Sequence, residues 1–135
     1  NMPFASKFMT TVNEDYAKNL SMRNEFEQFM SDVDDVQDRR RSISADKNLG
    51  VVEEAQFRTA LDKTPEGIVY NEWTWTPKGG RSWKNIYNDI MDEYKEARDN
   101  GDVEERKEKM KELDNLRKSA IKVFKESLKK NGYVD

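Results

Sequence analysis

The sequence contains no histidine and no cysteine. Without them the chain cannot form a Ser-His or Cys-His nucleophilic site, use an imidazole for acid–base catalysis, or bind zinc through its usual structural ligands. Catalysis would have to depend on carboxylates that hold Mg²⁺, on a desolvated lysine or on a tyrosine, and no spacing of these residues marks a site. We therefore predict that the protein is not an enzyme and uses no cofactor and no metal.

The absence of cysteine also excludes a disulfide framework, which fits a cytoplasmic protein. No stretch approaches the roughly 18 consecutive apolar residues of a membrane span, and no charged segment followed by an apolar run indicates a signal peptide. Apolar residues make up 35% of the chain and charged residues 38%, and the mean hydropathy is -1.08. We expect a cytoplasmic protein without a membrane partner, with a thin core in an elongated or oligomeric form.

A chain of 135 residues without internal repeats or low-complexity tracts is most simply one domain. We expect a single, mainly helical domain over residues 2–135, with Asn1 ahead of a natural start at Met2. Residues 39–50 are expected to form a connection between helices. Residues 77–82 are expected to turn the chain from a strand into a helix.

The acidic run 32–38 has the composition of a calcium loop but not its pattern. Val36 stands where a calcium loop has a ligand, Gln37 stands where it needs a glycine, and Ile43 stands where it has its closing glutamate. We interpret the run as a solvated helix face held by ion pairs one turn apart. The expected pairs are Asp35 with Arg39 and Asp38 with Arg41.

Two further segments resemble recognition motifs. The glycines of 77–82 precede a helix N-terminus, where anions bind, but their spacing matches neither phosphate-loop pattern. Residues 39–43 have the look of a basophilic kinase site, although such strings arise often by chance. We interpret the first as a plain turn and the second as a solvated connection.

The strongest pattern is a pair of apolar stripes at spacings of three and four between residues 82 and 131. The first stripe comprises Trp83, Ile86, Tyr87, Ile90, Tyr94 and Ala97. The second comprises Val103, Met110, Leu113, Leu116, Ala120, Phe124 and Leu128. Ser82 and Asp102 stand where N-caps belong, and Gly101 stands where a helix ends in a left-handed residue. These signals predict a C-terminal antiparallel helical hairpin with a coiled-coil-like seam.

The N-terminal part of the chain is predicted to form a helical segment that packs on this hairpin. Residues 11–14 have capping-box spacing, and helical register continues almost to Arg41, with a break allowed at 19–21. One apolar face of this N-terminal segment is expected to complete a core of three or more helices. That face carries Phe26, Phe29, Met30 and Val33.

The middle of the chain allows two interpretations. Residues 51–61 are rich in helix formers, which favours a helix there. However, residues 56–62 also alternate in polarity, and the turn tetrapeptide 64–67 permits a β-hairpin with 68–75. Residues 68–76 are rich in β-branched and aromatic side chains and are expected to form a small β element. A lone strand must find a partner in this chain or in another one.

Tyr70, Trp73 and Trp75 belong to this expected strand and are residue types that interfaces favour. The sequence leaves open whether Trp73 and Trp75 lie in the core or at an interface. We hypothesise a small accessory protein that acts by binding a larger protein, as an adaptor, inhibitor or assembly factor, or by forming a homo-oligomer. No residue motif identifies a family, and none supports the impression of a small phage-encoded protein.

The alternative is nucleic-acid binding. Residues 103–130 contain ten basic and six acidic residues, and four lysines share one face. These are Lys118, Lys122, Lys125 and Lys129. Such a stripe can follow a phosphate backbone, and an exposed tryptophan can stack on unpaired bases. A basic helix end also complements the helix macrodipole without any ligand, so we favour protein binding.

Overall fold

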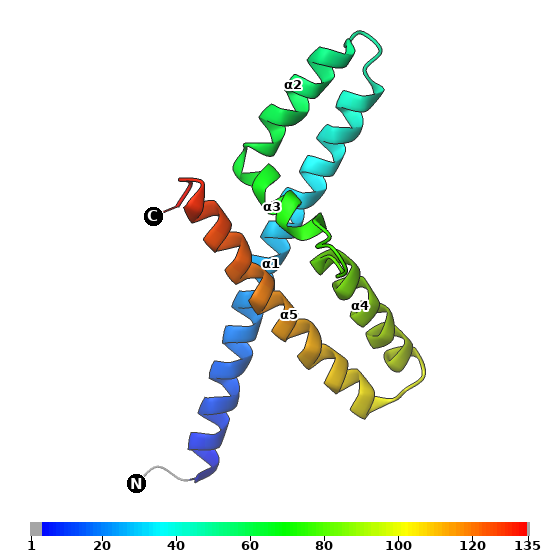
Figure 1. Ribbon diagram of the computed structural model, residues 1–135. Helices are drawn as coiled ribbons and strands as arrows, with labels where there is room; N and C mark the ends of the chain where they lie inside the picture. Colours follow the sequence, from blue (N-terminus) through cyan, green and yellow to red (C-terminus); the bar gives the residue numbers. More distant parts are fainter. Residues whose placement is uncertain (1–3, 135) are drawn as a thin grey trace.

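The computed structural model describes the backbone of residues 4–134 and the side chains of residues 16–134; the expected start at Met2 lies outside this part. The chain forms five helices and, within the described residues, no strand. They are α1 (Phe4–Ala45), α2 (Val51–Asp62), α3 (Pro65–Thr74), α4 (Trp83–Asp99) and α5 (Val103–Lys130). The mainly helical class is therefore confirmed. Figure 1 shows α1 running the length of the molecule and α5 crossing it, with α3 at the crossing point.

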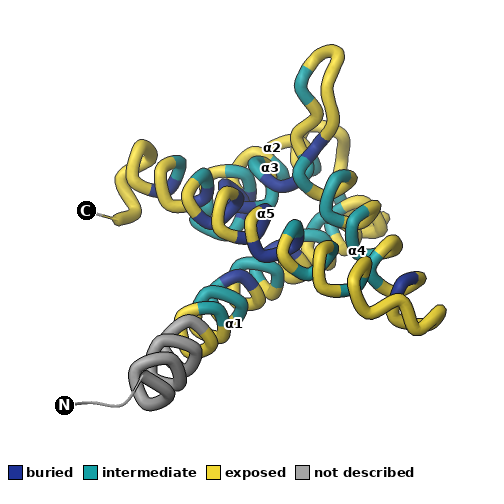
Figure 2. Tube along the Cα trace, turned by 90° about the horizontal axis from the view of Figure 1, so that it is seen from below, coloured by how far each residue is buried: buried dark blue, intermediate teal, exposed yellow. Residues whose placement is uncertain are grey.

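The core lies where α1, α3 and α5 meet, and α4 covers one side of it. Figure 2 shows the buried residues concentrated at this crossing, while the ends of the helices are exposed. Phe26 and Phe124 have no exposed surface, and Trp73 is 4% exposed. The Trp73 ring stands edge-on to Phe26 at 5.6 Å and to Tyr87 at 5.5 Å between ring centroids. Aromatic pairs in this geometry contribute about 0.5–1.5 kcal/mol each beyond their burial.

Helix α1 differs from the expected N-terminal helix in where it ends and in being continuous. It is unbroken through residues 19–21, and residues 11–14 lie inside it. The predicted connection at 39–50 is wrong for 39–45, because α1 continues to Ala45 and only residues 46–50 connect it to α2. An ion pair of 3.1 Å between Asp35 and Arg39 supports this last part of the helix.

The predicted apolar face of α1 does lie in or against the core. Phe26 and Val33 are buried, and Phe29 and Met30 pack beside them. The Phe29 ring lies 5.1 Å from the ring of Phe124 on α5. The face also meets α3, which the sequence pattern had placed in a strand.

The predicted strand at 68–76 is wrong. Helix α3 spans Pro65–Thr74, and the expected turn tetrapeptide is its N-terminus. The Thr64 hydroxyl accepts a hydrogen bond of 3.0 Å from the Gly67 N–H, and Pro65 occupies the first helical turn, where its missing N–H costs nothing. The cap and the burial of one helical face therefore override the β-propensity of the side chains.

The presence of helix α3 in place of a strand changes two other expectations. The alternative β-hairpin between 56–62 and 68–75 is absent, and the helix favoured over 51–61 is confirmed as α2. Residues 77–82 connect helix to helix rather than strand to helix. No strand edge is left for a partner within residues 4–134.

A glycine allows α2 and α3 to meet at a sharp corner. A side chain at Gly67 would clash with the carbonyl oxygen of Leu61, in the last turn of α2. The corner also carries the bond from the Thr64 hydroxyl to the same carbonyl, at 2.6 Å. Only glycine permits this approach of the two backbones.

Helices α4 and α5 lie side by side (Figure 1), joined by residues 100–102. The expected end signals are confirmed. Ser82 accepts from the Asn85 N–H at 3.1 Å, and Asp102 accepts from the Glu105 N–H at 3.1 Å. Gly101 has a φ of +71°, the left-handed conformation that ends α4.

Candidate interaction surfaces

The three aromatic residues predicted to bind a partner are in different environments. Trp73 belongs to the core and is not accessible. Tyr70 is half-buried: its hydroxyl donates to Gln37 Oε1 at 3.0 Å, and the Arg40 guanidinium lies 5.3 Å from its ring centroid. Trp75, which ends α3, is 65% exposed. Of the three, only Trp75 presents its side chain to solvent.

Trp75 stands at the base of the segment between α3 and α4, which projects from the body of the molecule in Figure 2. A tight turn shapes this segment: the Gly80 N–H donates to the Pro77 carbonyl at 2.9 Å, and Gly79 has a φ of +74°. The Trp75 side chain also lines a surface pocket with neighbours on α3, among them Asn71.

The four lysines of the nucleic-acid alternative are all exposed on α5. At 100° per residue, Lys107 and Lys111 fall on the same line and are also exposed, so the row has six members. We name this row the lysine stripe; it runs for about 33 Å along the helix. Its members are Lys107, Lys111, Lys118, Lys122, Lys125 and Lys129.

One member of the lysine stripe is already paired. Lys125 lies 2.9 Å from a carboxylate oxygen of Glu25 on α1. Among residues 16–134, no carboxylate is within 4.0 Å of the other five ammonium groups. The sequence-based list stopped at Lys118, although the i, i+4 and i+7 spacing that joins the four lysines extends to Lys111 and Lys107.

A third surface lies on what we name the arm, residues 35–64. The end of α1 and the whole of α2 run side by side there and project from the crossing (Figure 1). The arm buries little of its apolar surface. Val51 is 86% exposed, Val52 69% and Phe57 52%.

A groove runs between the two helices of the arm, and we name it the arm groove. Its walls come from residues one turn apart on each helix, and apolar side chains dominate its α2 wall. It is lined by Asp38, Arg39, Ser42, Ile43, Phe57, Ala60, Leu61 and Thr64. A second apolar surface covers another face of α2, with Val51, Val52 and Ala55 among its residues.

The arm groove was not predicted from the sequence, because residues 39–45, which form part of its α1 wall, were expected to be a connection rather than a helix. A signal was present: α2 carries two apolar rows although it is only 12 residues long. One row runs from Phe57 through Leu61 and the other from Val52 through Ala55. A short helix that packs on a single neighbour can cover only one such row.

Among residues 16–134, the buried charges Asp114 and Arg117 lie at the crossing, together with the partly buried Arg23. Arg23 on α1 donates two hydrogen bonds to the Asp114 carboxylate on α5, at 2.9 and 2.7 Å, and Arg117 donates a third at 3.0 Å. The Arg117 guanidinium lies 5.7 Å from the ring of Phe26 and 5.8 Å from that of Tyr87. The three charges are paired with one another across α1 and α5, although the buried Nε–H of Arg117 has no partner.

The environment of Asp114 has opposing effects on its ionisation. Burial alone would raise the pKa of the Asp114 carboxyl, but the hydrogen bonds from Arg23 and Arg117 outweigh it and lower the pKa below its ordinary value. On the other side of α5, hydrogen bonds to Glu93 and Glu112 raise the pKa of Lys109 above its ordinary value. Both groups therefore carry their charges at neutral pH.

The described part of the chain has no cluster of three or more acidic side chains placed to hold a metal ion. The acidic run 32–38 lies on α1, and its expected inward residues Val33 and Val36 are buried. The expected ion pairs are present at 3.1 Å for Asp35 with Arg39 and 4.0 Å for Asp38 with Arg41. None of the helices in residues 16–134 combines the length and the apolar character that crossing a membrane requires.

Comparisons with models of protein families, with curated proteins and with solved structures found no match to this chain. Function is therefore inferred from the surfaces described above.

Proposed function

We propose that this chain is a small non-enzymatic accessory protein that binds another protein through the arm groove. The observation that carries the proposal is the exposed apolar surface of the arm, with Phe57 half exposed beside Ile43 and Ala60. Clustered apolar surface of this kind is characteristic of interaction sites. Adaptor, inhibitor and assembly-factor roles all need such a surface and no catalytic group.

The occupant of the groove in this proposal is an amphipathic helix of the partner protein. A groove with residues one turn apart on both walls fits apolar side chains at positions i, i+3 and i+4 of a third helix. Helix α2 has 12 residues, about 18 Å, so a partner helix of three to four turns covers it. The arm contains six acidic and six basic residues, so its contacts with the partner are mainly apolar rather than ionic.

In this proposal the α4–α5 pair is an antiparallel hairpin that supports the crossing and leaves the arm free. A second copy of the chain is a less suitable occupant. The groove is only as long as α2, whereas a stable dimer buries about 800 Å² on each partner. A homo-oligomer through the arm groove alone is therefore expected to be weak.

Site-specific photo-crosslinking in the native cell tests the proposal. A benzophenone amino acid at position 42, on the α1 wall, should crosslink to a partner chain, whereas one at position 95 on α4 should not. The crosslink should persist at about 1 M salt, where the Debye length is about 3 Å. Adding Phe57→Asp should abolish it. Mass spectrometry of the crosslinked segment should find apolar residues at helical spacing.

Two results would contradict the proposal. One is a crosslink at position 42 that is unaffected by Phe57→Asp. The other is a crosslinked segment that belongs to a second copy of this chain. Sedimentation of the purified protein gives an independent check, because a monomer at working concentration leaves the groove open.

The lysine stripe supports a second candidate function, nucleic-acid binding. Its specific support is a row of six exposed lysines; the one acidic residue on the same line, Asp114, is buried and bonded to Arg23 and Arg117. If the stripe follows a phosphate backbone, affinity should fall with salt, and each lysine removed should lower the salt slope by about 1. Lys118→Gln and Lys122→Gln should therefore reduce the slope, whereas Lys95→Gln on α4 should not. An equal effect of all three variants would exclude the stripe.

A further inference from the structure

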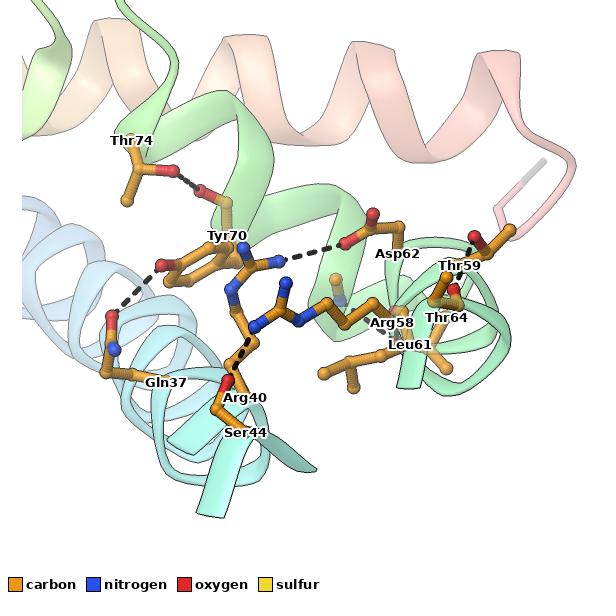
Figure 3. A network of polar contacts seen from close by, with 12 residues as sticks. Gln37, Arg40, Ser44, Arg58, Thr59, Leu61, Asp62, Thr64, Tyr70 and Thr74 are labelled. Carbon is orange, nitrogen blue, oxygen red and sulfur yellow. Dashed lines mark hydrogen bonds and ion pairs between the residues drawn. The ribbon is translucent and has the colours of Figure 1, made fainter. Parts of the chain in front are cut away.

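The arm has a further pocket on the face of α1 opposite the arm groove. The lining of this pocket is polar and basic. We name it the arginine pocket. It is lined by Gln37, Arg40, Arg41, Ser44, Ala45 and Arg58. Three of these residues are arginines and none is a carboxylate. Figure 3 shows Arg40 reaching from α1 and Arg58 from α2 into the space between the helices.

The two central arginines are only partly satisfied. Arg40 lies 3.4 Å from Asp62 through one terminal nitrogen. Arg58 uses one terminal nitrogen for both Glu54, at 3.0 Å, and the Ser44 hydroxyl, at 2.5 Å. The Nε–H of Arg58 is buried and has no hydrogen-bond partner. A buried charged donor without an acceptor is costly.

The other polar side chains of the pocket also have donors to spare. Gln37 accepts from the Tyr70 hydroxyl with its amide oxygen, which leaves the amide NH₂ for another acceptor. Ser44 accepts from Arg58 and keeps its own hydroxyl hydrogen. Arg41 has one ion pair among residues 16–134, with Asp38 at 4.0 Å, and both side chains are about three-quarters exposed. Such a pair contributes little, so Arg41 is free to turn toward a ligand.

The unused guanidinium donors favour an anion. The three arginines have ion pairs with Asp62 at 3.4 Å, Glu54 at 3.0 Å and Asp38 at 4.0 Å, each through one terminal nitrogen. The remaining N–H groups of each guanidinium are left for another acceptor. Guanidinium groups match the oxygens of phosphate in pairs, through charge-assisted hydrogen bonds. We propose that the arginine pocket binds a phosphate-type oxyanion, either the free ion or a phosphate monoester. This proposal does not depend on the arm groove.

Nuclear magnetic resonance of the arginine Nε–H groups in the full chain tests the proposal. Inorganic phosphate and O-phosphoserine are titrated separately at constant ionic strength, with chloride as the reference anion. The Nε–H signals of Arg58 and Arg41 should shift and saturate with one or both phosphate compounds, whereas that of Arg98 on α4 should not. Saturation with phosphate alone identifies the free ion, and tighter binding of phosphoserine identifies a monoester.

A charge-matched pair of variants locates the site. Arg41→Gln should weaken binding about tenfold, the loss of one charge-assisted hydrogen bond, and it should keep the fold because Arg41 is exposed. Arg98→Gln removes the same charge from α4 and should have no effect. The proposal is overturned if phosphate and chloride shift the signals alike, or if the two variants weaken binding equally.

Discussion

The crossing of α1, α3 and α5 and the arm are built from the same helix α1, but they use it differently. At the crossing, Phe26 of α1 is fully buried and touches aromatic rings from two other helices. In the arm, Ile43 of α1 is half-buried and faces an exposed Phe57. The crossing buries its apolar side chains and pairs its charges, although the Nε–H of Arg117 stays without a partner, whereas the arm leaves apolar surface exposed. This difference assigns the stability of the fold mainly to the crossing, and it is the basis of the proposed binding on the arm.

The largest effect is expected at the crossing, where Trp73 is buried and its neighbour Trp75 is exposed. Trp73→Ala should reduce the free energy of unfolding by about 3–5 kcal/mol, because it leaves a large cavity between four helices. Trp75→Ala should change it by less than about 0.5 kcal/mol, because Trp75 is 65% exposed. Urea denaturation followed by circular dichroism measures both. Equal effects would mean that the crossing is not the core.

The buried ion cluster of the crossing should come next. Asp114→Asn should reduce the free energy of unfolding by about 3 kcal/mol at neutral pH, because it leaves two arginines without their carboxylate. Asp99→Asn, at an exposed ion pair with Arg98, should have almost no effect. Thermal unfolding of both variants at one pH provides the comparison.

The same cluster predicts a pH dependence. The pKa of Asp114 is lowered in the folded state, so its stabilising contribution is complete above the unfolded pKa of about 3.9 and is lost as the pH falls through the folded value. The wild type should therefore lose more stability than Asp114→Asn between pH 5 and acid conditions. Parallel stability curves for the two proteins over that range would contradict the assignment.

The corner that joins the arm to the crossing should give a smaller effect. Gly67→Ala should reduce stability by about 1–3 kcal/mol, because its Cβ meets the Leu61 carbonyl and the backbones must separate. Gly50→Ala is the matched control at the other end of α2, where a Cβ meets nothing within 4 Å and the φ is -76°. Hydrogen exchange should show faster opening of the first turn of α3 in Gly67→Ala only.

Removal of an exposed aromatic side chain from the arm should leave the free energy of unfolding nearly unchanged. Phe57→Ala should change the free energy of unfolding by less than about 0.5 kcal/mol, since more than half of the side chain is exposed and alanine is a better helix former. Phe26→Ala, the same change at the crossing, should cost about 3–5 kcal/mol. A strong destabilisation by Phe57→Ala would show that the arm packs against something within this chain.

The helices at the C-terminal end could be predicted because local and global signals agree there. Ser82, Asp102 and Gly101 fix the ends of α4 and α5, and the apolar stripes fix the faces that are buried. At α3 these signals conflict: Ile68 to Trp75 consists largely of strand formers, and the cap at Thr64 decides for a helix. The cap residues looked like a turn in the sequence, so the strand prediction followed.

The candidate surfaces were harder to predict than the helices. Two tryptophans separated by one residue lie on different sides of a helix end, so one can be buried and the other exposed, but only after the helix is known. The lysine stripe was visible because it depends on one helix alone. The arm groove and the arginine pocket each need two helices, and their residues become neighbours only when α2 folds back on α1.

Because α1 is a single helix of 42 residues, about 63 Å long, it acts as a rigid rod that passes from the crossing into the arm. The rod cannot hinge between the two without breaking several of its backbone hydrogen bonds. A molecule that docks on the arm therefore meets walls already held in place and spends little free energy on ordering them. The same rod fixes the direction in which any cargo on the arm is presented relative to the lysines of α5.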